Sequence, residues 1–343
     1  MMNIETLLEK RNSIRKLPVN LDSSDLDLFQ NSIKYSVLAT KLLHLKNITI
    51  IKRGILFDDN KVMTESFPTP REKDKWVNSK DYVKFLIRNY FFSNYKVIEQ
   101  ECFWITDIWS NGYFHWFADA LPRLLTIKEK IKNATLLLPF AYKKIDFITS
   151  SLKYFLIKDL KFINGTVLCR NLKMPTHTAL TGYFNESIIR ELRSLYVHHY
   201  QNAKNDYAGS KVYISRNKAE RRKILNEDEC REVLEEYDFK TVFFEDHTFE
   251  EQIKIAYGSK YLISNHGAGL TNMLFMKPGS SVFELRARKN FINNCYFNMA
   301  SALNLKYFYQ LCDSDNQDND NQLSNLTVDL QMLKENIEQM LTN

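Results

Sequence analysis

The second half of the chain alternates between short apolar runs and segments with helical spacing of apolar residues. Short runs of apolar, often β-branched residues predict buried strands, and a 3.6-residue period predicts helices. Strands that alternate with helices predict a parallel, doubly wound sheet. The expected strands are 211–215, 241–244, 261–264, 281–285 and 306–311, and the expected helices are 226–236, 249–256, one from about residue 270, and 293–303.

The first half follows a less regular pattern. Residues 1–45 are expected to be helical and peripheral, and residues 47–66 to form a hairpin that turns at Asp58, Asp59 and Asn60. Residues 80–93 fit a helix or a strand equally well. Further strands are expected at 97–108, 134–139 and 160–168, and further helices at 113–131, 142–157 and 186–204. This alternation predicts a second α/β half.

The polar, glycine-bearing segment Gln201–Ser210 is the best candidate for a linker. We therefore expect an N-terminal, acceptor-binding domain at 1–205 and a C-terminal, nucleotide-sugar-binding domain at 206–312. A flexible polar loop and a closing amphipathic helix are expected within 313–343. The length of 343 residues suits about two domains. Ligands are expected at the carboxyl ends of the strands, in a cleft between the halves.

Composition and charge exclude several classes of protein. Hydrophobic residues make up 44% of the chain, which predicts a folded protein. A net charge of +6 is too modest to indicate nucleic-acid binding. The five cysteines are scattered without a CxxC pair, so a disulfide framework and a structural zinc site are not expected. No secretory signal or membrane-spanning run is recognised, so a cytoplasmic location is expected.

The segment Asn265-His266-Gly267-Ala268-Gly269 lies between an expected strand and an expected helix. Glycines at such a turn allow the backbone to approach a ligand closely, and the N–H groups that begin the helix favour an anion. A nucleotide phosphate is the natural ligand. The third glycine of a GxGxxG motif is missing, so a dinucleotide fingerprint is not supported. A tight turn with packing glycines is the alternative.

Two further features follow strands of the same half. Glu284 is expected at the end of a strand, where its carboxylate would suit ribose hydroxyls; an ordinary exposed acid is the alternative. The basic loop Ser215–Lys223 contains Arg216, Arg221 and Arg222. Arginine suits bidentate contact with phosphate, so the loop suggests a diphosphate clamp, and a solvated run of charge is the alternative.

In the first half, His115 and Asp119 are four residues apart and would share one face of a helix. A histidine acts as a general base, and a neighbouring carboxylate orients it or is itself the base. A histidine satisfied by a local aspartate is the alternative. A third ligand for zinc is not apparent nearby, and Asp313-Ser-Asp315 lies in the polar loop, so a metal–diphosphate site is not indicated.

These residues lie in three motifs that resemble glycosyltransferase family 61, a family once described as capsular polysaccharide biosynthesis proteins. The first motif runs from Tyr113 to Arg123 and contains His115 and Asp119. The second runs from Tyr213 through the arginines to Glu227. The third runs from His266 through Gly269 and Asn272 to Leu285. Together they span roughly residues 105–310, and the third is the most specific.

The resemblance implies a GT-B architecture of two Rossmann-like domains that face a central cleft. It implies an inverting sugar transfer without an essential metal or other cofactor. The resemblance assigns the donor to the C-terminal half: Arg216, Arg221, Arg222 and the turn His266-Gly267-Ala268-Gly269 would bind the diphosphate, Asn272 would add a hydrogen bond, and Glu284 would bind the ribose. It assigns Asp119 and His115 to the acceptor, with Asp119 as the first choice for the base.

The sequence thus predicts an inverting glycosyltransferase that uses a nucleotide-sugar, expected to be UDP-linked, in bacterial capsule or lipopolysaccharide synthesis. The acceptor would be a glycan or a lipid-linked saccharide, and peripheral contact with the inner face of the plasma membrane is compatible with the charge. Nucleic acid is not an expected partner. The alternatives are a nucleotide-sugar epimerase or hydrolase, and a non-catalytic nucleotide- or glycan-binding module on the same fold.

Overall fold

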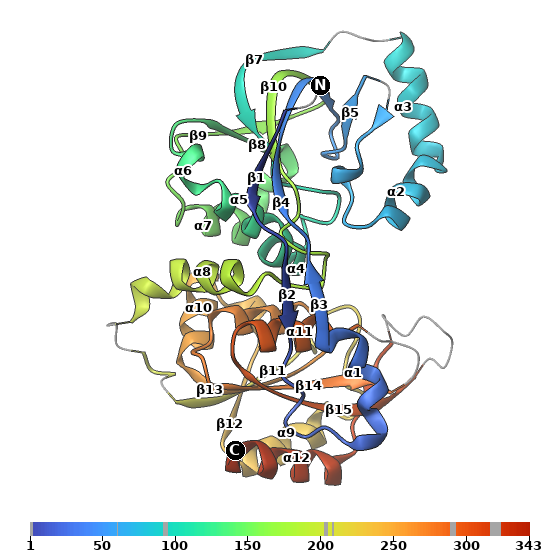
Figure 1. Cartoon of the computed structure of the whole chain (residues 1–343). Helices are drawn as coiled ribbons and strands as arrows, with labels where there is room; N and C mark the ends of the chain where they lie inside the picture. Colours follow the sequence, from blue (N-terminus) through green and yellow to red (C-terminus); the bar gives the residue numbers. More distant parts are fainter. Residues whose placement is uncertain are drawn as a thin grey trace. The chain divides into compact units, whose positions relative to one another are not determined.

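A computed structural model describes residues 3–59, 61–91, 95–201, 205–207, 209–288, 293–315 and 324–343. The chain divides into two compact units, each with its own sheet (Figure 1). Unit 1 comprises Met1–Arg11 and Ser36–Thr181, and unit 2 comprises Asn12–Tyr35 and Gly182–Asn343. Both units combine helices with a sheet, which confirms the predicted α/β class.

The sheet of unit 2 is parallel except at one edge. Its order is β12-β11-β13-β14-β15-β16, and only β16 runs antiparallel to its neighbour. The alternation predicted for the second half is therefore confirmed. The strands are β11 (Ser210–Ile214), β12 (Phe239–Val242), β13 (Ser259–Asn265), β14 (Ser281–Ala287), β15 (Lys306–Ser314) and β16 (Leu326–Thr327).

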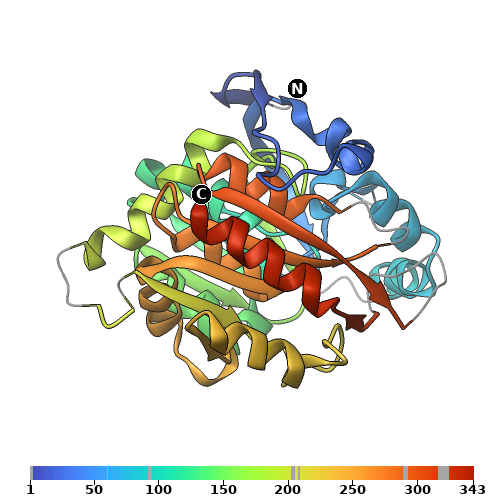
Figure 2. The same ribbon diagram turned by 90° about the horizontal axis from the view of Figure 1, so that it is seen from below.

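Helices cover both faces of this sheet. On one face, α9 (Glu227–Glu236) and α12 (Leu330–Thr342) pack side by side and bury Leu234 and Ile337 against the strands (Figure 2). On the other face lie α8, α10, α11 and the 3-10 helix η7 (Figure 1). Their bounds are α8 (Glu186–Val197), η5 (His198–Tyr200), η6 (Phe244–Asp246), α10 (Phe249–Gly258), η7 (Ala268–Phe275) and α11 (Cys295–Ala302).

The sheet of unit 1 is mixed, which differs from the predicted Rossmann-like domain. Strands β10, β7, β8 and β9 are parallel neighbours, but β4 runs antiparallel to β10, and both β1 and β5 run antiparallel to β4. The N-terminal strands join the parallel part through this antiparallel pairing. The strands are β1 (Asn3–Leu8), β4 (Thr40–Ile50), β5 (Leu56–Asp58), β6 (Lys61–Val62), β7 (Lys96–Phe103), β8 (Thr135–Pro139), β9 (Asp159–Ile163) and β10 (Val167–Pro175).

The helix expected at 113–131 is present but is broken into short pieces. A π-helix, η3 (Trp116–Ala120), separates α4 (Tyr113–His115) from α5 (Leu121–Thr126), and α6 (Lys128–Ile131) follows. The ambiguous segment 80–93 is helix α3 (Lys80–Phe91), and residues 92–93 lie outside the described residues. The remaining helices of the unit are η2 (Thr64–Ser66), α2 (Pro70–Val77), η4 (Phe140–Lys144) and α7 (Asp146–Leu152).

The helical reading of residues 1–45 was wrong. Besides β1 and the start of β4, this stretch forms β2 (Arg11–Ile14) and β3 (Lys34–Val37), with η1 (Ser23–Asp25) and α1 (Leu26–Ile33) between them. Most of its described residues are exposed or half-buried, but some of them join it firmly to the rest of unit 2. The Val19 N–H donates to the Tyr307 carbonyl at 2.8 Å, and Phe29 is fully buried among aromatic rings of unit 2. Such pairings join residues far apart in the sequence and leave no local signature.

The compact units also differ from the predicted domain boundaries. Helix α8 belongs to unit 2, because the Arg190 Nε donates to the Ala302 carbonyl at 2.6 Å and the Arg193 Nη1 donates to the Leu303 carbonyl at 2.8 Å. The division after residue 181 therefore precedes the expected linker, of which residues 202–204 and 208 lie outside the described residues. The segment 313–343 contributes β16 and α12 to unit 2, and its residues 316–323 are not described.

We expect Phe29→Ala to lower the free energy of unfolding by about 3–5 kcal/mol, because it leaves a cavity among the rings of Phe297, Tyr307 and Tyr309. Urea unfolding followed by circular dichroism measures the change. Leu26→Ala in the same helix is the matched control, since Leu26 is 43% exposed. Equal effects of the two substitutions would contradict the burial of this N-terminal segment.

Candidate functional site

The strand order of unit 2 reverses direction between β11 and β13. These strands are parallel neighbours, although β12 lies between them in the sequence. In doubly wound sheets, ligands bind at the carboxyl edge where the strand order reverses. The loop with Arg216, Arg221 and Arg222 follows β11, and the turn His266–Gly269 follows β13. The structure therefore brings two of the three predicted features to one edge.

Arg216 lies directly against Gly267. A Cβ atom added to Gly267 would be 2.5 Å from the Nη1 of Arg216, which is less than any real contact. The φ angle of Gly267 is 165°, an extended backbone that any residue adopts. A side chain at position 267 would therefore have to displace the Arg216 guanidinium from its present place.

The guanidinium groups of Arg216 and Arg222 are close enough to repel each other. Burial, followed by the charge of Arg222, lowers the pKa of Arg216. The Nε atoms of both arginines are buried and have no hydrogen-bond partner among the described residues. Two neighbouring positive charges with unsatisfied donors favour an anion. The Arg221 side chain is exposed, and the Arg221 carbonyl accepts from the Nη2 of Arg216 at 3.4 Å.

The turn after β13 starts a 3-10 helix at Ala268, and the α-helix expected from Leu270 does not form. The N–H groups of Ala268 and Gly269 begin this helix and therefore have no acceptor within it. Asn272 is buried, and its Nδ2 donates to the Gly269 carbonyl at 3.1 Å. This contact supports the turn, and the expected hydrogen bond from Asn272 to the donor stays a prediction.

Glu284 does not end its strand as expected. Strand β14 continues to Ala287, and Glu284 is fully buried in its middle. One carboxylate oxygen bonds the Nδ1 of His266, and the other accepts from the Tyr307 hydroxyl. Arg286, also buried in β14, adds a positive charge. Both charged residues can be buried within the strand because each has a partner inside the unit.

The electrostatics of this pair point to a neutral histidine. Burial alone would raise the pKa of Glu284, but the charge and hydrogen bond of His266 and the charge of Arg286 lower it overall. Burial lowers the pKa of His266 despite the attraction of Glu284. At neutral pH the Nδ1–H of His266 therefore donates to an ionised Glu284.

In unit 1, His115 and Asp119 form the expected pair. The Nδ1 of His115 lies 2.8 Å from the Oδ2 of Asp119, across the π-helix. The Thr181 hydroxyl donates to the same carboxylate oxygen at 2.9 Å. The side chain of Asp119 is only 3% exposed, whereas that of His115 is 24% exposed. The histidine is therefore the member of the pair that solvent reaches.

Several polar residues near these sites were given no role from the sequence; among them, His177 was considered as a residue that could line the cleft, but without a partner. In unit 2, buried Glu227 accepts from the hydroxyls of Tyr213 and Ser215, both at 2.7 Å, beneath the end of β11. In unit 1, the Oδ2 of Asp107 lies 2.8 Å from the Nε2 of His177. The available signal was weak: Asp107 closes an apolar strand, and His177 follows one. No spacing rule joins residues so far apart.

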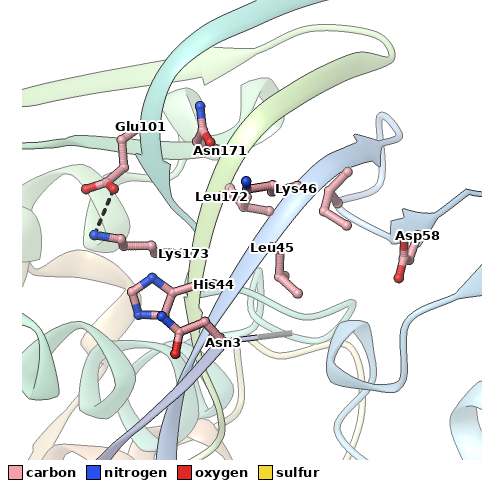
Figure 3. Close-up of a pocket in the computed structure, with 10 residues that line it drawn as sticks. Asn3, His44, Leu45, Lys46, Asp58, Glu101, Asn171, Leu172 and Lys173 are labelled. Carbon is pink, nitrogen blue, oxygen red and sulfur yellow. Dashed lines mark ion pairs between the residues drawn. The ribbon is translucent and has the colours of Figure 1, made fainter. Parts of the chain in front are cut away.

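A hollow of about 520 Å³ lies beside β4, β7 and β10 in unit 1 (Figure 3). Its lining includes His44, Lys46 and an ion pair between Lys173 and Glu101 at 2.7 Å. None of the site residues predicted from the sequence lines it. It is therefore separate from the candidate sites.

Two features of the described part of the chain concern metals and membranes. Among those residues, no group of three or more His, Cys, Asp or Glu side chains is arranged to hold a metal ion. Within the same ranges, no helix combines the length and the apolar character that crossing a membrane requires.

One family model matches a stretch of sequence that contains candidate residues of both units. Residues 113–283, about half of the chain, match the family model Glycosyltransferase 61. The chain is 36% identical over 99 residues to the EGF domain-specific O-linked N-acetylglucosamine transferase of Drosophila melanogaster, which covers 28% of this chain and 18% of that protein. It is 36% identical over 80 residues to the protein O-linked-mannose beta-1,4-N-acetylglucosaminyltransferase 2 of Mus musculus, which covers 22% of this chain and 14% of that protein.

The chain therefore aligns with less than a fifth of the length of these relatives. The family match is more extensive and includes His115 and Asp119 in unit 1, and the arginine loop and the turn 266–269 in unit 2. These are the residues that the geometry identifies as candidate sites. The chain belongs to the glycosyltransferase 61 family.

Proposed function

We propose that this protein is an inverting glycosyltransferase, in which unit 2 binds a nucleotide-sugar donor and unit 1 binds the acceptor. The observation that carries the proposal is the position of Arg216 against Gly267, beside Arg222. Both arginines have a buried, unsatisfied Nε–H, and the N–H groups that begin η7 lie in the same turn. A diphosphate would satisfy these donors and offset the repulsion between the two charges.

The geometry of unit 1 favours His115 as the base, in place of the first choice of Asp119. The carboxylate of Asp119 is buried and accepts from both His115 and Thr181. Its hydrogen bond to Nδ1 leaves the Nε2 of His115 to accept a proton. Asp119 then orients the imidazole and stabilises its protonated form.

The transfer follows from these two assignments. The acceptor hydroxyl loses its proton to the Nε2 of His115 while its oxygen attacks the anomeric carbon. The bond between that carbon and the diphosphate oxygen breaks with inversion, and the electron pair leaves on the diphosphate. Arg216 and Arg222 stabilise the negative charge that develops there.

The finer parts of the sequence prediction stay predictions. They comprise the GT-B arrangement, the UDP-linked donor, independence of metal, a lipid-linked acceptor and a role in bacterial capsule or lipopolysaccharide synthesis. The names of the aligned relatives specify N-acetylglucosamine transfer to EGF domains or to O-linked mannose. Glu284 is reassigned within this proposal: its oxygens already bond His266 and Tyr307, so we propose that it holds His266 and does not bind the ribose.

We expect the melting temperature of the protein to rise with one nucleoside diphosphate from a set of UDP, GDP and dTDP, with CMP as a monophosphate comparison. A ligand at about 100 times its Kd stabilises the native state by about 2.7 kcal/mol. A shift that persists in EDTA supports metal-independent binding. A response to CMP alone would contradict the diphosphate site.

We expect Arg216→Ala and Gly267→Ala each to abolish most of that shift. The first removes a phosphate ligand, and the second places a Cβ where the Arg216 guanidinium now lies. Lys218→Ala is the matched control, because Lys218 is in the same loop but is already paired with Asp246. An unchanged nucleotide response in both site variants would refute the proposed clamp.

We expect His115→Ala to lower kcat for donor consumption by about 10²–10⁴-fold, since it removes the general base. Asp119→Asn keeps the shape of the side chain but loses the charge that orients and stabilises the imidazolium, so we expect a fall of at least about 10-fold. The nucleotide-induced thermal shift should remain in both variants. A larger loss in Asp119→Asn than in His115→Ala would restore Asp119 as the base.

A further inference from the structure

A second histidine–carboxylate pair lies at the same strand edge of unit 1 as His115. Strands β7 and β10 are parallel neighbours, so the segments that follow them leave from the same edge of the sheet. The segment after β7 carries Asp107, His115 and Asp119, and the segment after β10 carries His177 and Thr181. Hydrogen bonds connect the two segments: His177 bonds Asp107, and Thr181 bonds Asp119, the partner of His115.

Asp107 is a rigid anchor for His177. Its Oδ2 lies 2.8 Å from the Nε2 of His177, and its Oδ1 accepts from the Trp109 N–H at 2.9 Å and from the Ser110 hydroxyl at 3.0 Å. Burial alone would raise the pKa of Asp107, but the hydrogen bond and charge of His177 and the charge of Arg123 lower it overall. The carboxylate is therefore ionised at neutral pH, and both of its oxygens are engaged.

Arg123 connects the two pairs. It is fully buried, and its Nε donates to the Pro175 carbonyl at 2.8 Å, two residues before His177. Burial lowers its pKa to about 10, and the charges of Asp107 and Asp119 oppose that effect. Arg123 is thus still protonated at neutral pH and attracts both carboxylates. One buried cation stabilises the anchors of His115 and His177 together.

Trp109 contacts a member of each pair. The main chain of Trp109 bonds Asp107, and its indole lies 4.8 Å from the ring of His115, centroid to centroid. The His177 side chain is 18% exposed, and its Nδ1 has no hydrogen-bond partner among the described residues. The imidazole of His177 is thus held at Nε2 and is partly exposed to solvent at the same sheet edge as His115. Such a ring is suited to contact a substrate.

We propose that His177 binds a hydroxyl group of the sugar acceptor through its Nδ1, with Asp107 as its positioning residue. The inference rests on the proposed function, which places the acceptor beside His115. A sugar hydroxyl both donates and accepts, so it pairs with Nδ1 in either protonation state of the ring. His115 then takes the proton, and His177 holds the sugar ring in place for the attack.

The test compares His177→Gln and Asp107→Asn with the unmodified full-length chain, using a panel of p-nitrophenyl glycosides as acceptors. We expect His177→Gln to raise KM for the acceptor by about tenfold, with little change in kcat, because one hydrogen bond to bound sugar is lost. Slow donor hydrolysis, in which water is the acceptor, should stay within twofold of the unmodified chain. Asp107→Asn should also raise the acceptor KM, since it frees the imidazole to rotate.

His44→Gln is the matched control, because His44 also faces a carboxylate in unit 1, 3.8 Å from Glu5, but lines the separate hollow. An unchanged acceptor KM in His177→Gln would overturn the inference, and so would a parallel loss of donor hydrolysis. The thermal shift with nucleoside diphosphate is measured on the same samples. Its absence in the unmodified chain would mark failure of the proposed function, whereas its presence with an unchanged KM would mark failure of this inference alone.

Discussion

A carboxylate is stable inside a protein only where hydrogen bonds or a positive charge replace the water that it has lost. Asp107, Asp119, Glu227 and Glu284 are each at most 6% exposed, and each meets this requirement through specific donors. Three of them are held by a histidine, and Glu227 is held by the hydroxyls of Tyr213 and Ser215. Satisfying the buried acids thereby determines how the imidazole rings of the candidate sites are oriented.

The strand order of each sheet brings the candidate site residues together at one edge. In unit 2, the strand order makes β11 and β13 neighbours, so a basic loop and a glycine turn about 50 residues apart share one edge. In unit 1, β7 and β10 are parallel neighbours, so the two histidine-bearing segments that follow them also share one edge of the sheet. Polar groups gather at these edges because the chain leaves each strand there, and the sheet behind them is rigid and apolar.

The sequence was most informative where a property is local. The alternation of strands and helices after residue 210, the glycine turn and the His115–Asp119 spacing were all visible as patterns of neighbouring residues. The N-terminal stretch was misread because its strands pair with segments that are not adjacent in the sequence, β1 with β4 and β2 with β3, and because Val19 bonds the Tyr307 carbonyl far along the chain. Glu284 was misplaced for a related reason: a charged residue reads as a strand end unless its buried partners are known.

By itself, the sequence singled out the candidate site residues and, through three motifs, the family to which the chain belongs. Only the tertiary structure decided what those side chains contact. It assigned Asp119 to a buried supporting position and brought His177 to Asp107, 70 residues earlier in the chain. It also put the guanidinium of Arg216 in the space that Gly267 leaves open. The physical reason is that hydrogen bonds and close packing between remote segments depend on strand order and register, which leave no periodicity in the local sequence.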